Sequence, residues 1–330
     1  MESAETATRG RAQECGGAER IRVGVSACLL GAEVRFDGGH KRDTFIADTL
    51  ARFVELVPVC PEVELGLGVP REAIRLERDG EAVRLIAEKS GADHTAAMRA
   101  YAERRADALA HEALCGYILK SNSPSCGMER VRVHGAHGPP SRSGRGLFAE
   151  ALLARLPNLP VEEEGRLSDA RRRENFIERI FAYHRLQTFF RARWTRGGLV
   201  AFHTAHKLEL LAHSPRAYTG LGRMVAAMYD RDRADIREAY QAAFMMALSK
   251  PATTARHANV LQHIAGYFRR HLDPQGRREL TALIEDYRVG DVPLIAPITL
   301  VSHYARRFAI AYLEGQVYLE PAPRELMRLG

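Results

Sequence analysis

The chain lacks long hydrophobic runs: no stretch approaches the roughly 18–20 consecutive apolar residues that a membrane-spanning helix needs. Residues 1–20 also lack the apolar core of a secretory signal, so we expect a disordered tail there. Cysteine is scarce, and five in 330 residues do not suggest the disulfide framework of a secreted protein. We therefore expect a cytoplasmic protein with reduced thiols, in which Cys15 of the tail is incidental.

A metalloprotease motif is also lacking. HEXXH does not occur, and His203 and His206, three residues apart, have no evident third ligand. We expect these two histidines to form a basic, hydrogen-bonding face instead.

Positive charge is concentrated in the second half of the chain. Residues 165–330 hold 26 Arg or Lys against 16 Asp or Glu, a balance of +10, whereas the remainder holds 22 against 25. Nearly all of this charge is Arg, which suits contacts with phosphate. An anionic partner for the second half is one explanation, and an Arg-rich codon usage is the other.

The first half alternates strand-like and helical patterns. IRVGV, VPVC and GYILK are typical of short strands, whereas TFIADTLARFVEL and residues 92–114 have helical patterns. This order predicts an α/β domain with a mainly parallel sheet over residues 21–165. RFDGGHKRD is typical of a turn, and AHGPPSRSGRG of a loop that precedes the helical LFAEALLARL.

Strand signals fade from Leu167 onward, and helical patterns follow one another. The longest begins after a candidate N-cap, Ser168 or Asp169, and continues through RRRENFIERIFAYHRLQTFFRARW. Later stretches are also helical, one of them spanning residues 222–249, and VGDVPLIAPITL fits either a strand or the start of a helix. We therefore expect an all-α domain over residues 166–330.

Three cysteines, Cys28, Cys60 and Cys126, each follow a short apolar run. Because the loops that leave the carboxyl ends of parallel strands meet in one crevice, we expect these thiols to converge. Thiolates suit zinc or an iron–sulfur cluster, and three of them leave one position of a four-coordinate centre open. The alternative is three buried, unreactive thiols, which is how we interpret Cys115 at the start of a strand.

The contexts of these cysteines are specific. SACLLG, RFDG, PVCPEVELGLGVPR and LKSNSPSCG together closely resemble the TudS-like thiouracil desulfidase family over residues 20–160. In the second half, RENFIERIFAYHR, LVAFHTAHKLELLAHSP and YTGLG resemble the YbgA-type helical domain. The fusion is similar to tRNA 4-thiouridine desulfidases of the RudS type. The resemblance implies a 4Fe-4S cluster held by Cys28, Cys60 and Cys126, with one iron not ligated by protein.

The resemblance also implies that sulfur is removed from a thiolated uracil. An open iron would bind the thiocarbonyl sulfur while water attacks C4 of the base. We predict that Glu62, two residues after Cys60, takes the proton of that water, with Glu64 as the alternative base. The competing interpretation of Glu62 is a structural ion pair with Arg71.

Ser121 is a second candidate catalytic residue, and the candidates for substrate binding are Ser123, Asp37 and Glu64. Ser121 is predicted to position the edge of the base, and Ser123 is the second candidate for this role. Asp37 could line the pocket, although a turn-forming role is favoured. A Ser/Pro loop is also common turn chemistry, which is the alternative for both serines.

Our leading hypothesis is a desulfidase that converts 4-thiouridine in tRNA to uridine and sulfide, with the basic helical domain holding the tRNA. A first alternative acts on free 4-thiouracil or thionucleosides and uses the helical domain for oligomerisation. A second is a non-enzymatic cluster or thiol sensor that binds nucleic acid, and a third is a zinc hydrolase. Candidates for RNA contacts are Arg171–Arg173, Arg191, Arg193 and Arg196.

Overall fold

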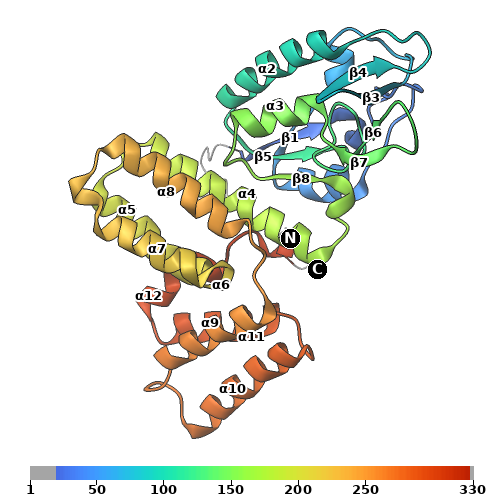
Figure 1. Ribbon diagram of the computed structural model, residues 1–330. Helices are drawn as coiled ribbons and strands as arrows, with labels where there is room; N and C mark the ends of the chain where they lie inside the picture. Colours follow the sequence, from blue (N-terminus) through green and yellow to red (C-terminus); the bar gives the residue numbers. More distant parts are fainter. Residues whose placement is uncertain (1–19, 328–330) are drawn as a thin grey trace, which may run out of the picture.

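The computed structural model describes residues 20–327, and its two halves differ in architecture (Figure 1). Strands dominate the first half, whereas the second half, from α4 (Ala170–Arg191) to α13 (Arg324–Met327), is helical. The predicted fold class, an α/β domain with a mainly parallel sheet followed by an all-α region, is confirmed. Residues 1–19, where a disordered tail with Cys15 is expected, lie outside the described range.

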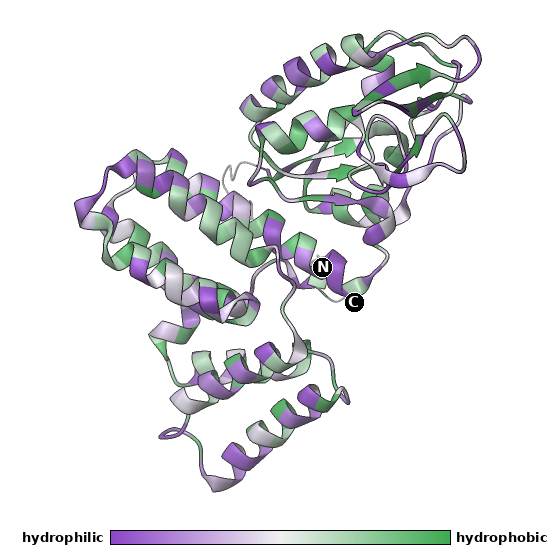
Figure 2. Cartoon of the chain, viewed as in Figure 1, coloured by the Kyte–Doolittle hydropathy of each residue, from purple (hydrophilic) through white to green (hydrophobic). Residues whose placement is uncertain are grey.

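The central sheet of the first half has four parallel strands. The inner strands are hydrophobic (Figure 2), and their side chains are mostly buried, as expected for parallel strands covered on both faces. The order across the sheet is β2 (Glu55–Val59), β1 (Arg22–Ser26), β5 (Leu114–Leu119) and β8 (Val161–Glu163).

Helices cover the two faces of this sheet. On one face, α2 (Thr95–His111) packs against α3 (Leu147–Arg155), and Phe148 of α3 meets Tyr117 of β5. On the other face, Ile180 of α4 lies so close to Gly116 that a Cβ there would be 2.8 Å from its Cγ1. Because neighbouring residues of a strand point to opposite faces, α3 and α4 sandwich β5 between them.

The connection from β1 to β2 contains less helix than the sequence predicts. Two short turns, Phe45–Thr49 and Leu50–Arg52, are helical, whereas Glu55 and Leu56 already belong to β2. Ile46 and Leu50 are fully buried, one helical turn apart. The prediction of a helix through Leu56 is therefore wrong at its end, where pairing with β1 takes over.

A second sheet, which the sequence analysis does not predict, has the order β4 (Ala82–Ala87), β3 (Ile74–Asp79), β6 (Val131–His134) and β7 (Ser141–Gly144). Strand β7 lies within AHGPPSRSGRG, so the prediction of a loop there is wrong in part. At Gly144 a Cβ would be 2.5 Å from Cγ2 of Val133, so glycine permits the close pairing of β6 and β7.

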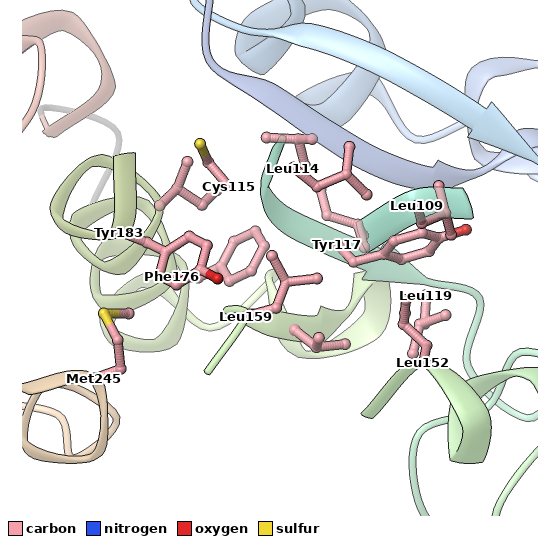
Figure 3. Close-up of a cluster of buried hydrophobic side chains, with 14 of the residues drawn as sticks. Leu109, Leu114, Cys115, Tyr117, Leu119, Leu152, Leu159, Phe176, Tyr183 and Met245 are labelled. Atoms are coloured by element: carbon pink, nitrogen blue, oxygen red, sulfur yellow. The ribbon is translucent and has the colours of Figure 1, made fainter. Parts of the chain in front are cut away.

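Helix α4 joins the two halves. Asp169 caps it by accepting a hydrogen bond from the backbone N of Arg172 at 2.9 Å, which decides between the two candidate N-caps. Figure 3 shows Phe176 and Tyr183 of α4 beside Cys115, in a buried cluster that reaches the second half. Cys115 is 2% exposed, as a core residue should be.

The other helices surround two cores, one continuous with the first half and one around α9 and α10. The helical stretch expected over residues 222–249 is interrupted, because Asp232 starts a new helix by capping α8. No helix among residues 20–327 is long and apolar enough to cross a membrane. The remaining helices are α1 (Pro61–Glu64), α5 (Arg196–Ala205), α6 (Lys207–His213), α7 (Pro215–Ala226), α8 (Arg233–Leu248), α9 (Thr254–Tyr267), α10 (Pro274–Val289), α11 (Ile295–Arg307) and α12 (Ala311–Glu314).

Gly24→Ala tests the packing at the centre of the sheet. A Cβ at Gly24 of β1 would overlap the buried ring of Tyr117 on β5. We expect the free energy of unfolding, measured with urea, to fall by about 1–3 kcal/mol, the usual cost of overpacking a core. The matched control is Gly220→Ala, where nothing lies within 4 Å of the added Cβ, and which should stabilise α7. Equal effects of the two substitutions would contradict this packing.

Candidate active site

A cavity of about 510 Å³ lies at the carboxyl edge of the central sheet. Cys28 follows β1 by two residues, Cys60 directly follows β2, and Lys120 directly follows β5. The volume falls within the range of about 300–1,000 Å³ that is typical of small-molecule sites. Among the predicted site residues, those that line this cavity are Cys28, Cys60, Cys126, Glu62, Ser121 and Ser123.

Each cysteine reaches the cavity from a different local structure. Cys28 lies in a 3-10 turn that ends at Gly31, whose φ of 96° favours glycine. Cys60 precedes α1, and Cys126 lies in the loop after β5. Burial raises the pKa of Cys28 to about 11 even though the charge of Lys120 opposes it. Burial likewise raises the pKa of Cys60 and of Cys126, so a bound cation is needed to hold these thiols as thiolates.

The donor set fits an iron–sulfur cluster. None of the four described cysteines forms a disulfide. No group of three His, Cys, Asp or Glu side chains among residues 20–327 is arranged to hold a metal ion. In a cluster each thiolate binds a different iron, so three thiols on the wall of one cavity are compatible with such a group. Cys28, Cys60 and Cys126 provide three such thiols.

Glu62 is held on both carboxylate oxygens. Arg71 donates to Oε2 from Nε at 3.1 Å and also from Nη2, and Ser125 Oγ donates to Oε1 at 2.9 Å. The side chains of Arg71 and Glu62 are only 5% and 15% exposed. The ion pair named as the alternative in the sequence analysis is therefore present, and it fixes the carboxylate at the wall of the cavity.

Glu64 and Asp37 do not line the cavity. Glu64 Oε1 accepts from the backbone N of Cys60 at 3.2 Å, and its Oε2 accepts from the Tyr101 hydroxyl at 2.7 Å. Asp37 Oδ1 accepts from the backbone N of Gly39 at 3.1 Å within an exposed turn. The turn-forming role favoured for Asp37 agrees with this geometry, and Glu64 supports the loop that carries Cys60.

Ser121 belongs to a hydrogen-bonded group that the sequence analysis missed in part. Its Oγ donates to Glu164 Oε1 at 2.8 Å, and its backbone N donates to Oε2 at 2.7 Å. Lys120 Nζ donates to Glu164 Oε1 at 2.5 Å and to Ser121 Oγ at 3.1 Å. Lys120 directly follows a strand, which is a signal that could have identified it. Glu164 also directly follows a strand, but this strand, the three-residue β8, is not predicted from the sequence.

Ser123 shapes the loop that carries Cys126. Its Oγ accepts hydrogen bonds from the backbone N of Ser125 at 3.2 Å and of Cys126 at 3.0 Å. This side-chain oxygen therefore holds the turn in which Cys126 lies. Ser123 also lines the cavity, so both roles proposed for it fit its position.

The prediction of a basic face at His203 and His206 is wrong. The two side chains are 3% and 2% exposed, and burial lowers their pKa to about 4 and about 3. His203 Nδ1 bonds to the Tyr240 hydroxyl, and His206 Nδ1 bonds to the carbonyl of Phe202. Both rings are therefore neutral parts of the helical core.

The two halves of the chain match two different families. Residues 23–164 match the family model for 2-thiouracil desulfurase, and residues 207–323 match a family of proteins of unknown function, DUF1722. The chain belongs to the families of both halves: a domain of the 2-thiouracil desulfurase family is fused to a YbgA-type domain.

Individual relatives each correspond to less than half of the chain. The uncharacterised protein YbgA of Escherichia coli is 42% identical over 152 residues, which are 46% of this chain and 90% of YbgA. The uncharacterised protein YbbK of Bacillus subtilis is 33% identical over 153 residues, 44% of this chain and 97% of YbbK. A solved structure, the 4Fe-4S-dependent thiouracil desulfidase TudS, is 34% identical and covers 46% of this chain and 95% of its own, with a TM-score of 0.38.

Arg71→Met tests the buried ion pair. The substitution leaves Glu62 with only one of its partners, and we expect a loss of about 3–5 kcal/mol in the free energy of unfolding. Arg84→Met is the control, because Arg84 pairs with Asp79 and Asp93 at the surface and should cost at most about 1 kcal/mol. In the double variant Arg71→Met/Glu62→Gln much of the loss should be recovered. If the losses in the free energy of unfolding of the two single variants simply add in the double variant, Arg71 and Glu62 are not coupled.

Proposed function

We propose that the chain is an iron–sulfur desulfidase that replaces the thiocarbonyl sulfur of a thiolated uracil with oxygen. The observation that carries this proposal is that cysteines from three separate loops line one cavity of a domain that matches the 2-thiouracil desulfurase model. The proposed cofactor is a 4Fe-4S cluster, the group named for TudS. Cys28, Cys60 and Cys126 would hold it and leave one iron without a protein ligand, and this iron would supply a Lewis acid.

Glu62 is the proposed general base. Arg71 occupies Oε2, and Ser125 donates a single hydrogen bond to Oε1, so Oε1 keeps a lone pair for a water molecule. Water oxygen bonds to C4 of the base, the carbon–sulfur bond breaks, and the two protons of the water pass to Glu62 and to the departing sulfide. Carbon exchanges sulfur for oxygen, so no electron donor or acceptor is required.

Lys120 and Ser121 have proposed roles in charge balance and orientation. The ammonium group of Lys120 lowers the pKa of Cys28 against the larger effect of burial, so it favours the thiolate that a metal centre needs. The hydroxyl of Ser121 donates a hydrogen bond to Glu164 and accepts one from Lys120, so one lone pair remains to accept from an N–H at the edge of the base. Glu164 holds both side chains in place.

The finer proposal is that the substrate is 4-thiouridine in tRNA. A second cavity, of about 430 Å³, adjoins the first and shares Ser121 and Asn122 with it. Arginine is prominent in its wall, and arginine binds phosphate well. A base in folded tRNA must be flipped out of its stack before it can enter the cysteine cavity. The phosphates on either side of the flipped base would then lie next to these arginines. The arginines are Arg130, Arg142, Arg166 and Arg172.

Most of these arginines are available to bind phosphate. Arg166 pairs with Glu129 and with Glu162, whereas the other three have no carboxylate partner among residues 20–327. The acidic groups of this wall are engaged as well: Glu163 accepts from the backbone N of Met128, and Asp169 caps α4. Arg172 belongs to the Arg171–Arg173 run that the sequence analysis named. A reducing cytoplasm, where tRNA is found, is part of this proposal.

The alternative substrate is free 4-thiouracil or a thionucleoside. It is favoured by the fact that all residues that line the cysteine cavity lie between Ser26 and Cys126, so the helical half contributes none of them.

Cys126→Ala tests the cofactor. On protein prepared without oxygen, we expect the wild type to contain about four irons with matching acid-labile sulfide per chain, and Cys126→Ala to lose most of both. The matched control is Cys115→Ala, because Cys115 is buried in β5 and lies outside the cavity, so this variant should keep its iron. Zinc without iron, or equal losses in both variants, would overturn the proposed cofactor.

Arg142→Ala and Arg172→Ala test the tRNA substrate. Each substitution should weaken tRNA binding and reduce the slope of log affinity against log salt by about 0.7–0.9 for each phosphate that the protein no longer neutralises. Turnover of free 4-thiouracil should not change. Arg288→Ala, which removes a surface partner of Glu285 on α10, is the control. Salt-independent tRNA binding, or equal losses in the control, would favour the free base as the substrate.

A further inference from the structure

A separate cavity of about 260 Å³ lies within the helical half. It shares no lining residue with the cysteine cavity or with the arginine-lined one. Its wall is formed by residues of α4, α6, α9 and α11, which Figure 1 labels, and of the segment from Tyr318 to Met327. Part of the lining is apolar and includes Leu294, Ile295, Ile298 and Leu319. Four glutamates also line the cavity: Glu174, Glu178, Glu209 and Glu320.

Glu209 is the unusual member of this wall. It is 2% exposed, and neither of its oxygens has a hydrogen-bond partner in the part of the chain that the structure describes. A buried polar group without a partner costs about 1–3 kcal/mol. Burial raises the pKa of Glu209 to about 7, although the charge of Arg185 opposes this shift. Arg185 itself donates to the carbonyl of Pro321 at 2.9 Å rather than to Glu209.

The histidines of the cavity are already engaged. His213 Nε2 lies 3.4 Å from Glu178 Oε2, and its Nδ1 bonds to the carbonyl of Lys250 at 2.8 Å, so both nitrogens have partners. His257 Nδ1 bonds to the hydroxyl of Tyr318 at 2.9 Å. An imidazole that ligates a metal needs a free nitrogen, which His213 does not offer. Within the described part of the chain, the side chain of Glu209 therefore lacks N–H donors for its two oxygens.

No Arg or Lys among residues 20–327 donates a hydrogen bond to Glu209, although the charge of Arg185 acts on it. Arg324 lines the cavity but lies 3.5 Å from Glu320, and both side chains are largely exposed. Burial and the neighbouring Glu178 raise the pKa of Glu174 to about 7, so its ionised form would be stabilised by a cation in the cavity. A cation with N–H donors would be attracted by these carboxylates, whereas a phosphate would be repelled.

We propose that this cavity binds a small organic amine, whose ammonium group donates hydrogen bonds to Glu209 and whose carbon chain packs against Ile295 and Ile298. The acidic side chains provide the charge complement, and the apolar side selects a ligand with a hydrocarbon body over a bare metal ion. This site does not depend on the proposed desulfidase reaction, because its residues lie outside the cysteine cavity.

The test uses the full chain and n-pentylamine at pH 8, with binding measured by calorimetry and by the shift in Tm. We expect the wild type to bind n-pentylamine with a rise in Tm, and to show no binding of 1-pentanol, which has the same carbon chain without the charge. Glu209→Gln keeps the shape of the side chain and should weaken amine binding at least tenfold. Glu174→Gln should weaken it to a smaller extent.

The control variant is Glu314→Gln, since Glu314 is exposed on α12 and outside the cavity, and it should bind the amine as the wild type does. Three results would overturn the proposal. These are no amine binding by the wild type, equal affinity in Glu209→Gln, and tighter binding of Zn²⁺ or Mn²⁺ than of the amine with loss in Glu209→Gln.

Discussion

Parallel pairing of β1 with both β2 and β5 is the constraint on which the cysteine cavity depends. Parallel strands end at the same edge of a sheet, so the segments that leave them meet there whatever their separation in the sequence. Cys28 and Cys60 come close in this way although a connection of some 30 residues separates them. An antiparallel partner for β1 would have sent one of these segments to the opposite edge.

The buried ion pair of Arg71 and Glu62 holds the wall of the cavity in place. The guanidinium group of Arg71 binds Glu62 and also donates to the carbonyls of Val34 at 2.9 Å and Gly68 at 3.0 Å. One side chain thus joins the loop after β1, helix α1 and the loop after it. Helix α4 has a similar connecting role on a larger scale, since it covers the sheet with Ile180 and contributes Glu178 to the separate cavity of the helical half.

Patterns along the sequence predict the α/β order and the positions of the cysteines, because both depend on local periodicity and on the residues directly after a strand. Other features depend on contacts between distant residues and are not predicted. β7 forms from a segment with loop composition because β6 offers it a pairing partner. Glu164 reaches Ser121 only once β8 lies beside β5. His203 is neutral because the surrounding helices bury it, which a spacing of three residues does not reveal.

Hydrolysis of a thiolated uracil at the cysteine cavity is tested most directly by the reaction of cluster-loaded protein with 4-thiouracil in water enriched in ¹⁸O, without an electron donor. Hydrolysis at the cysteine cavity predicts repeated turnovers, one sulfide released for each base converted, and one ¹⁸O atom at C4 of the uracil formed. Such turnover would also exclude a sensor without enzymatic activity. Absence of sulfide from loaded protein, dependence on an added reductant, or uracil without ¹⁸O would contradict hydrolysis at the cysteine cavity.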